Sequence, residues 1–456
     1  MKKLFTTIAS CILLLSLFHS CKKAAHDETA ASTLPANGRE AVQEEPITPL
    51  GQPIPLPAGS RQVQLNAQSG VAATHIPIIM VHGLGGFGPG ELGTFNYWGG
   101  VDNIPLYLTN SGFPAYATSV GPFSSNFDRA IDLYYYIKGG YVDYGKFHST
   151  HFGHHQTKSR YYPGVYPEWD ADHPVHLLGH SMGGITVRKL LQLLELGDRA
   201  EQQDPAHAAL FSGGKTGWVR SVTTISTPHN GATLTYKLLP DYAPFVKGLV
   251  IAAAGLAGTS LEADGIYDFD LEQWDLEREP GESFASYAGR VGNSRIWTTE
   301  DYSGHDVTPE AARDWNQAEP DSKNVYYFSV STRSSVKGLL TGWEYPQLTT
   351  FPVLIPVAFP VPIIMGLGNY TQNMPGKVVI DQKWWANDGA ANVYGMSGPN
   401  TSIIKPYAPA TLEKGVWNHI GVYNGYDHFA IIGMGLVPYN VRPFYMNLAS
   451  LLGAVE

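Results

Sequence analysis

The chain has 456 residues and a formal net charge of −10, and its lysines and arginines form no basic stripe, so nucleic acid is not an expected partner. The length allows two or three domains, although elaborated α/β enzymes of this size also fold as one unit. The 26 tyrosines and 10 tryptophans suit a large core with an apolar pocket.

The N-terminus has the pattern of an export signal. A positive start, Met1-Lys2-Lys3, precedes an apolar run from Leu4 to Phe18 and then His19-Ser20-Cys21. We expect residues 1–20 to be a signal peptide of the bacterial lipoprotein kind, with Cys21 as the lipidated first residue. Phe18 and His19 depart from the usual lipoprotein pattern, and an ordinary cleaved signal with an incidental cysteine is the alternative.

The cysteines agree with a lipid anchor. Cys11 lies inside the signal, so Cys21 would be left without a disulfide partner in the mature chain. A lipid on Cys21 would attach the protein to a membrane. We expect an extracytoplasmic protein at the outer membrane or cell surface of a bacterium. Residues 21–74, rich in Ala, Pro, Gly, Glu and Gln, are expected to form a flexible tether.

The remaining chain, 75–456, alternates buried-strand patterns with helical ones. Apolar runs at 75–83, 174–180, 219–229 and 324–332 predict strands, and residues 183–196 predict an amphipathic helix. This alternation indicates the α/β class, with a mostly parallel central sheet flanked by helices.

A G-x-S-x-G motif lies between the second predicted strand and the predicted helix. In the α/β-hydrolase arrangement, the serine of this motif sits on a sharp turn, which requires small neighbours. Gly179 to Gly183 fit this context, and they make Ser181 a candidate nucleophile with the Met182 N–H facing the developing oxyanion. The alternative is a polar residue in an ordinary glycine-rich connection.

The glycine-rich stretch "VHGLGGFG", 81–88, follows the first predicted strand. The Leu84 N–H could supply the second oxyanion donor, and His82 would support the turn. A plain tight turn is the alternative.

A serine nucleophile needs a histidine base and a carboxylate, which follow it in the order Ser, Asp or Glu, His on this fold. Asp388 lies in a loop-like segment, and Asp381 and Asp427 compete with it. His428 is the last histidine of the chain, with His419 as its competitor.

Long stretches of the chain resemble the thermoalkalophilic bacterial true lipases. They include "FNYWGGV", "GPFSSNFDRA", "SVTTISTPHNGATL", "YDFDLEQWDL", "LTGWEYPQL" and "YNGYDHFAIIG". The resemblance implies an α/β-hydrolase fold with a zinc-binding part, about 122–165 with 266–310, and a helical lid, about 233–262. It also implies a triad of Ser181, Asp388 and His428 and an oxyanion hole of Leu84 and Met182.

The histidine-dense stretch "HSTHFGHH", 148–155, is by itself as consistent with a polar surface loop as with a metal site. The resemblance implies structural zinc held by Asp128, His148, His154 and Asp301. Two carboxylates and two imidazoles would close a tetrahedral site. The possible competitors are His151, His155 and His305.

Calcium is where the sequence departs from the family. The two carboxylate ligands implied after the catalytic histidine fall on Ala430 and Gly435, and a glycine carbonyl ligand falls on Thr349. Calcium prefers several hard oxygens including carboxylates, so we expect no calcium there. Packing of Phe429, Ile431 and Ile432 would then hold the loop that carries His428.

Two apolar segments stay less defined. Residues 238–258 suit a core helix or, by resemblance, the lid. Residues 351–367 hold four prolines, which exclude a regular membrane-spanning helix; a strand and a pocket rim stay open for parts of this segment. The expected role of His180 is packing or orientation, and His173, His207, His229 and His419 are expected to be structural.

Together these features predict a membrane-tethered serine lipase acting on triacylglycerols at a lipid interface through an acyl-enzyme. The alternatives are a polyester or short-chain carboxylesterase, and a non-catalytic lipid-binding lipoprotein on a hydrolase scaffold.

Overall fold

A computed structural model describes residues 42–43, 46–58, 75–238, 267–347, 365, 374–434 and 439–455. The expected signal peptide, most of the tether, the lid from residue 239 onward, Thr349, Gly435 and all of 351–367 except Met365 lie outside these residues. No helix among the described residues has both the length and the apolar character needed to cross a bilayer.

Seven parallel strands of the described chain form the central sheet, in the order β11-β12-β8-β7-β6-β2-β3. Two smaller antiparallel sheets, β1-β9-β10 and β4-β5, lie outside it. The strands are β1 (Val42–Gln43), β2 (Ile78–Val81), β3 (Ala115–Ala117), β4 (Gly140–Asp143), β5 (Thr157–Tyr162), β6 (Val175–His180), β7 (Val219–Ile225), β8 (Tyr326–Arg333), β9 (Ser335–Gly338), β10 (Glu344–Pro346), β11 (Ile404–Pro406) and β12 (Trp417–Asn424).

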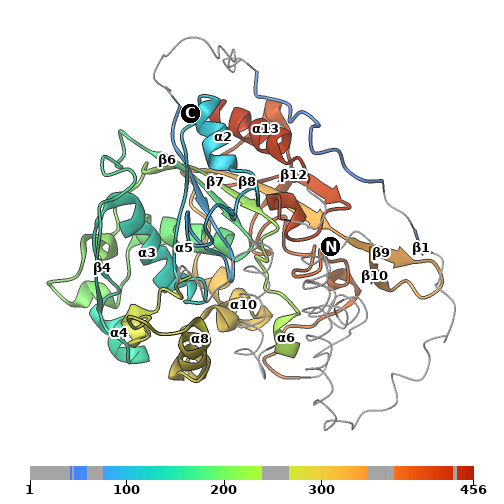
Figure 1. Cartoon of the computed structure of the whole chain (residues 1–456). Coiled ribbons are helices and arrows are strands. Elements are labelled where there is room, and N and C mark those ends of the chain that lie inside the picture. Colours follow the sequence, from blue (N-terminus) through green and yellow to red (C-terminus); the bar gives the residue numbers. More distant parts are fainter. Residues whose placement is uncertain are drawn as a thin grey trace, which may run out of the picture. The chain divides into compact units, whose positions relative to one another are not determined.

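Helices cover both faces of the central sheet (Figure 1). The α-helices are α2 (Ile104–Asn110), α3 (Asn126–Lys138), α4 (Lys146–Phe152), α5 (Met182–Leu196), α6 (Thr235–Leu238), α8 (Phe284–Gly292), α9 (Ser303–Asp306), α10 (Pro309–Ala318) and α13 (Arg442–Gly453). The short 3-10 helices are η2 (Glu201–Gln203), η3 (Ala209–Ser212), η5 (Glu272–Trp274), η6 (Arg295–Thr298), η7 (Gln382–Trp384), η8 (Pro409–Thr411) and η9 (Ala430–Ile432).

The two-residue period of β2 divides the core into two parts. Ile78 and Met80 join the cluster that contains α2 and α13, whereas Ile79 and Val81 join the cluster that contains α3 and α5. Successive side chains of a strand point to opposite faces, so an unbroken apolar strand is buried on both sides. Figure 1 shows the α2–α13 pair and the α3–α5 pair as separate groups.

The predicted α/β class with a mostly parallel sheet is confirmed, and all four predicted strands and the predicted helix are present. The third strand is shorter than predicted, because β7 ends at Ile225. Ser226 has a φ of 54°, which lies outside the extended region and turns the chain away from the sheet.

The structure differs from the expected flexible tether at residues 46–58. Leu50 and Ile54 are buried in the core, and the Thr48 N–H donates to the Asn424 carbonyl at the end of β12 (3.1 Å). Farther along, the Gln52 carbonyl accepts from the Asn447 side chain on α13 (3.0 Å). Composition predicted a solvated segment here, but two aliphatic side chains and a few backbone groups are enough to fix this strap, residues 46–58, to the folded unit.

We predict that Leu50→Ala and Ile54→Ala each lower the free energy of unfolding by about 2 kcal/mol, because each removes buried aliphatic contacts. Ile47→Ala, at a strap residue that is 62 % exposed, should change it by less than about 0.5 kcal/mol. Chemical denaturation of the three variants measures the difference. Equal free energies of unfolding for the three variants would show that the strap does not contribute to the stability of the folded unit.

Candidate active site and metal site

Ser181 stands on a sharp turn between β6 and α5. Its backbone has φ 55° and ψ −131°, a region that non-glycine residues rarely adopt. The turn is tight because glycines flank it. A Cβ on Gly179 would lie 2.4 Å from the Gly183 backbone, and a Cβ on Gly183 would lie 2.3 Å from the Val81 carbonyl oxygen. The G-x-S-x-G spacing is therefore a steric requirement of this turn.

Three side chains from distant parts of the sequence meet at this turn. His428 Nε2 lies 2.7 Å from Ser181 Oγ, and His428 Nδ1 lies 2.7 Å from Asp388 Oδ2. The Asp388 side chain is fully buried, and His428 is 4 % exposed. The structure thus brings together Ser181, His428 and Asp388, the three residues that the family resemblance implies as a triad.

The surroundings of Asp388 fix the direction of these hydrogen bonds. Asp388 Oδ1 accepts from the N–H groups of Ala390 (3.1 Å) and Ala391 (2.8 Å). Asp388 Oδ2 accepts from the Thr332 hydroxyl (2.7 Å), which can itself accept from Ser226 Oγ at 2.6 Å. A carboxylate held by donors accepts the Nδ1 proton of His428, so Nε2 is left to accept from Ser181.

The competing residues lie elsewhere. His419 Nδ1 is 3.2 Å from Ser329 Oγ, and Asp381 caps η7 by accepting from the Lys383 N–H. Asp427 lies beside His428 in sequence, but its Oδ1 accepts from the Phe429 and Ala430 N–H groups, both at 2.9 Å. Asp427 therefore shapes the loop, while Asp388 contacts the imidazole.

The backbone amides of Leu84 and Met182 are the expected oxyanion donors. Within the described residues, neither of these N–H groups donates a hydrogen bond. Met182 is the first residue of α5, and the first N–H groups of a helix have no partner inside the helix. His82 Nδ1 lies 2.9 Å from the Gly83 carbonyl oxygen, and its Nε2 faces the Val120 N–H at 3.4 Å. Burial and then the charge of Arg129 lower the His82 pKa to about 3, so the ring is neutral.

This neutral ring sets the orientation of the Leu84 amide. His82 Nε2 faces a donor and must accept, so Nδ1 carries the proton and donates to the Gly83 carbonyl. That carbonyl and the Leu84 N–H belong to one planar peptide unit and point in opposite directions. The hydrogen bond that holds the Gly83 carbonyl therefore also sets the direction of the Leu84 N–H.

Sequence reasoning gave no role to several residues that support the site. Arg129, which is fully buried on α3, donates to the carbonyls of His82 and Gly121 (2.7 Å) and to the Thr186 hydroxyl (2.9 Å). It ties the loop after β2 to α3 and α5. Tyr97 and Thr332 also contact the residues around Ser181. Gln273 and Glu201 contact a second cluster, that of Asp128 and His148. Arg129 lies in "GPFSSNFDRA" and Tyr97 lies in "FNYWGGV". Both stretches resemble the lipase family, and this resemblance is the sequence signal that could have pointed to the two residues.

A second cluster joins α3, α4 and the segment before α9. Asp128, His148, His154 and Asp301 each offer one ligand atom, and these atoms lie within 4.8 Å of one another. His148 Nε2 is 3.0 Å from Asp128 Oδ1 and 3.3 Å from Asp301 Oδ1. These are the four residues predicted as metal ligands, and they form a possible metal-binding site.

The electrostatics of this cluster require positive charge. Burial and the charge of Asp301 raise the pKa of Asp128. Burial opposes protonation of His148, but its hydrogen bonds to Asp128 and Asp301 outweigh this and raise the His148 pKa to about 10. His154 Nε2 and Asp301 Oδ2, 3.3 Å apart, are buried without a well-formed hydrogen bond. Four ligand atoms within 4.8 Å of one another suit a bound cation.

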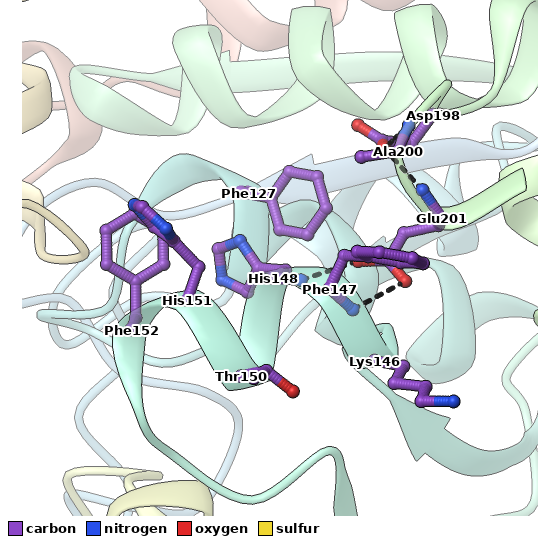
Figure 2. Close-up of a pocket in the computed structure, with 10 residues that line it drawn as sticks. All are labelled: Phe127, Lys146, Phe147, His148, Thr150, His151, Phe152, Asp198, Ala200 and Glu201. Atoms are coloured by element: carbon purple, nitrogen blue, oxygen red, sulfur yellow. Dashed lines mark hydrogen bonds between the residues drawn. The ribbon is translucent and has the colours of Figure 1, made fainter. Parts of the chain in front are cut away.

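Neighbouring side chains hold the ligands in place. Gln273 Nε2 donates to Asp128 Oδ2 (2.9 Å). The Glu201 carboxylate accepts the N–H groups of Phe147 (3.1 Å) and His148 (2.7 Å), and so caps the first turn of α4. Figure 2 shows the Glu201 carboxylate beside Phe147 and His148. These residues line a groove of about 620 Å³. The Phe127 and His148 rings, which also line it, stack with their centroids 4.1 Å apart.

The competing histidines do not join the cluster. His155 Nε2 pairs with Asp275 Oδ1 (2.8 Å), and His305 lies near Asp306 and Glu300. His151 is exposed and packs against Phe152. The remaining histidines have local partners, as expected for structural residues: Asp170 for His173, Ser212 for His207, and Thr224 for His229.

The loop after His428 is held by apolar packing. Ile431 and Ile432 are fully buried, Ala430 is 1 % exposed, and Phe429 is partly buried. The other two positions implied for calcium, Thr349 and Gly435, lie outside the described residues.

Solved structures of EstA and of two bacterial lipases resemble this chain. EstA from Clostridium botulinum is 36 % identical with a TM-score of 0.78, covering 90 % of this chain and 92 % of that chain. Lipase 1 from Pelosinus fermentans is 40 % identical with a TM-score of 0.72, covering 82 % and 97 %. Staphylococcus hyicus lipase is 31 % identical with a TM-score of 0.69, covering 85 % and 98 %. The α/β-hydrolase type of fold is thereby confirmed.

Curated relatives agree with this likeness. A lipase of Staphylococcus epidermidis is 37 % identical over 369 residues, covering 78 % of this chain and 50 % of the relative. Lipase 1 of Staphylococcus aureus is 34 % identical over 392 residues, covering 83 % and 54 %. The chain thus spans about half the length of these relatives. A family model described as "Lipase-like, C-terminal domain" matches residues 74–447, and the chain belongs to this family of bacterial lipases.

Proposed function

We propose that this protein is a serine hydrolase that cleaves the carboxylic ester bonds of triacylglycerols through an acyl-enzyme. The observation that carries the proposal is the continuous hydrogen-bonded chain from Ser181 through His428 to Asp388 at a strained turn. The names of the lipase relatives support the substrate class.

In this mechanism His428 Nε2 takes the proton of Ser181 Oγ as the oxygen attacks the ester carbonyl. Asp388 holds the imidazole and stabilises its charged form. His428 then gives the proton to the leaving alcohol, and the acyl group stays on Ser181. Water, activated by the same imidazole, releases the fatty acid and regenerates the serine.

The oxyanion is stabilised by the amides of Leu84 and Met182. Both are backbone donors, so their position depends on the turns that carry them and not on side-chain identity. Each such donor contributes about 10²–10³ in rate. The family resemblance implies a lid at about 233–262, of which residues 239–262 lie outside the described residues. Opening of such a lid would present apolar surface to a lipid interface.

We predict that a fluorophosphonate probe labels wild-type protein once, at Ser181, and that Ser181→Ala abolishes both labelling and ester hydrolysis. Thr186→Ser, which keeps a hydroxyl near the site, serves as the control and should retain labelling. Mass spectrometry of the labelled peptide identifies the modified residue.

The chain-length profile of the substrate defines the class of hydrolase. Emulsified long-chain triacylglycerols should be cleaved at rates comparable to or above those of soluble short-chain esters. A preference for soluble short esters would assign a carboxylesterase instead. A folded protein that the probe leaves unlabelled would favour a non-catalytic lipid binder.

We further propose that the Asp128, His148, His154 and Asp301 cluster binds structural zinc. Two imidazoles and two carboxylates fill a tetrahedral site and leave no position for substrate water. The ion would join α3, α4 and the segment before α9, which come from the zinc-binding part at about 122–165 and 266–310. It would cross-link this part, and no step of ester cleavage is assigned to it. At the loop after His428 we propose no calcium.

We predict about one zinc per chain in protein purified without added zinc, measured by plasma mass spectrometry. His148→Ala should lose the metal and lower the melting temperature, whereas His151→Ala, at a neighbouring residue outside the cluster, should keep both. A calcium-selective chelator should leave activity and stability unchanged. Zinc far below one per chain in wild-type protein would contradict the zinc site.

We propose that the enzyme acts outside the cytoplasm, attached to the outer membrane or cell surface of a bacterium by a lipid on Cys21. The signal over residues 1–20 and the single mature cysteine support this proposal.

Accordingly, Cys21→Ser should move the full-length protein from the membrane fraction to the soluble fraction, because the acyl chains that anchor it are lost. Cys11→Ser, inside the signal, should leave it in the membrane fraction. Cell fractionation with immunoblotting measures this. An unchanged distribution of Cys21→Ser would contradict the anchor.

A further inference from the structure

Three buried hydrogen bonds connect the loop after β2 to the loop after β12. The Gly83 N–H donates to Tyr97 Oη (2.9 Å), Tyr97 Oη lies 2.7 Å from His180 Nδ1, and His180 Nε2 lies 2.9 Å from the His428 carbonyl oxygen. Tyr97 is 4 % exposed and His180 is fully buried. We call this series the Gly83–His428 relay.

The chemistry of its two ends fixes every proton in the relay. The His428 carbonyl can only accept, so His180 Nε2 carries a proton and donates it. Burial, together with the nearby His428 ring, lowers the His180 pKa well below its usual value, so the ring is neutral and Nδ1 accepts. Tyr97 therefore donates its hydroxyl proton to Nδ1, and its oxygen accepts from the Gly83 N–H.

The relay touches three of the loops of the proposed active site, those after β2, β6 and β12. His180 precedes Ser181 in sequence, and its ring lies 4.8 Å from the His428 ring, centroid to centroid. Gly83 precedes Leu84, and a Cβ on Gly83 would lie 2.6 Å from the Ser181 Cβ, so this loop passes directly beside the nucleophile. One end of the relay holds the base, and the other holds the oxyanion loop.

We propose that Tyr97 and His180 are positioning residues that hold the His428 imidazole and the Leu84 amide in register with Ser181. The proposal rests on the proposed hydrolase function. Neither residue touches the reacting atoms. Each holds the backbone of a loop that does, and displacement of a catalytic group by about 1 Å costs about 10²-fold in rate.

The relay also explains why a histidine precedes the nucleophile. The side chain at this position must donate to a carbonyl on one side and accept from a phenol on the other, across a fully buried space. A neutral imidazole does both with one rigid ring, whereas an apolar residue does neither and would leave the Tyr97 hydroxyl and the His428 carbonyl unsatisfied.

The test compares Tyr97→Phe with Tyr327→Phe in the full chain. Tyr327 is a matched control, because it is also buried and its hydroxyl oxygen also accepts a backbone N–H, that of Ser322 (2.9 Å). We expect Tyr97→Phe to lower kcat on a soluble ester about 10- to 100-fold with KM within about twofold of wild type. Tyr327→Phe should keep kcat within about twofold. Similar kcat values for the two variants would overturn the proposal.

A second measurement does not depend on turnover or on a variant that folds. Nitrogen-15 NMR of wild-type protein with labelled histidine should show His180 protonated at Nε2 and unchanged between pH 5 and pH 9. A His180 ring that titrates in this range, or carries its proton on Nδ1, would overturn the relay. Failure of wild-type protein to label at Ser181 would instead count against the hydrolase function and leave this NMR result to decide the relay.

Discussion

The constraint on which the proposed active site depends is the strained backbone of Ser181. Ser181 has a φ of 55° and a ψ of −131°, which form the sharp turn between β6 and α5. At positions 179 and 183 only glycine fits, because a Cβ at either position would clash with neighbouring backbone atoms. The free energy cost of the strain is of order 1–3 kcal/mol, which the surrounding packing must offset. The parallel sheet supplies that packing and places the loops after β2, β6 and β12 at the same edge.

Buried polar groups then set the positions of these loops. Arg129 and His82 hold the loop after β2, and Thr332 and two backbone amides hold Asp388. Tyr97 and His180 join the loop after β2 to the loop that carries His428. Asp128 of the possible metal-binding site precedes Arg129 on α3, so one helix contributes to that site and also holds the loop after β2. Buried polar groups of this kind stabilise one arrangement, because each alternative leaves a donor or acceptor unsatisfied.

The sequence predicted the parts with strong local signals. Long apolar runs gave β2, β6, β7 and β8, and the strand-turn-helix context singled out Ser181. Asp388 could not be separated from Asp381 and Asp427 by spacing, because tertiary contacts decide which carboxylate reaches the imidazole; the family resemblance made that choice. The short strands β3 and β11 and the strap at 46–58 were missed because their periodicity is too brief. Tyr97 was missed because its role exists only in the folded chain.

The most direct test of the central claim is a crystal structure of the protein after reaction with a fluorophosphonate. The account predicts a covalent bond from phosphorus to Ser181 Oγ, with the phosphonyl oxygen within hydrogen-bond distance of the Leu84 and Met182 backbone nitrogens and His428 still bonded to Asp388. An adduct whose phosphonyl oxygen faces away from both amides would contradict the account, as would modification of any other residue.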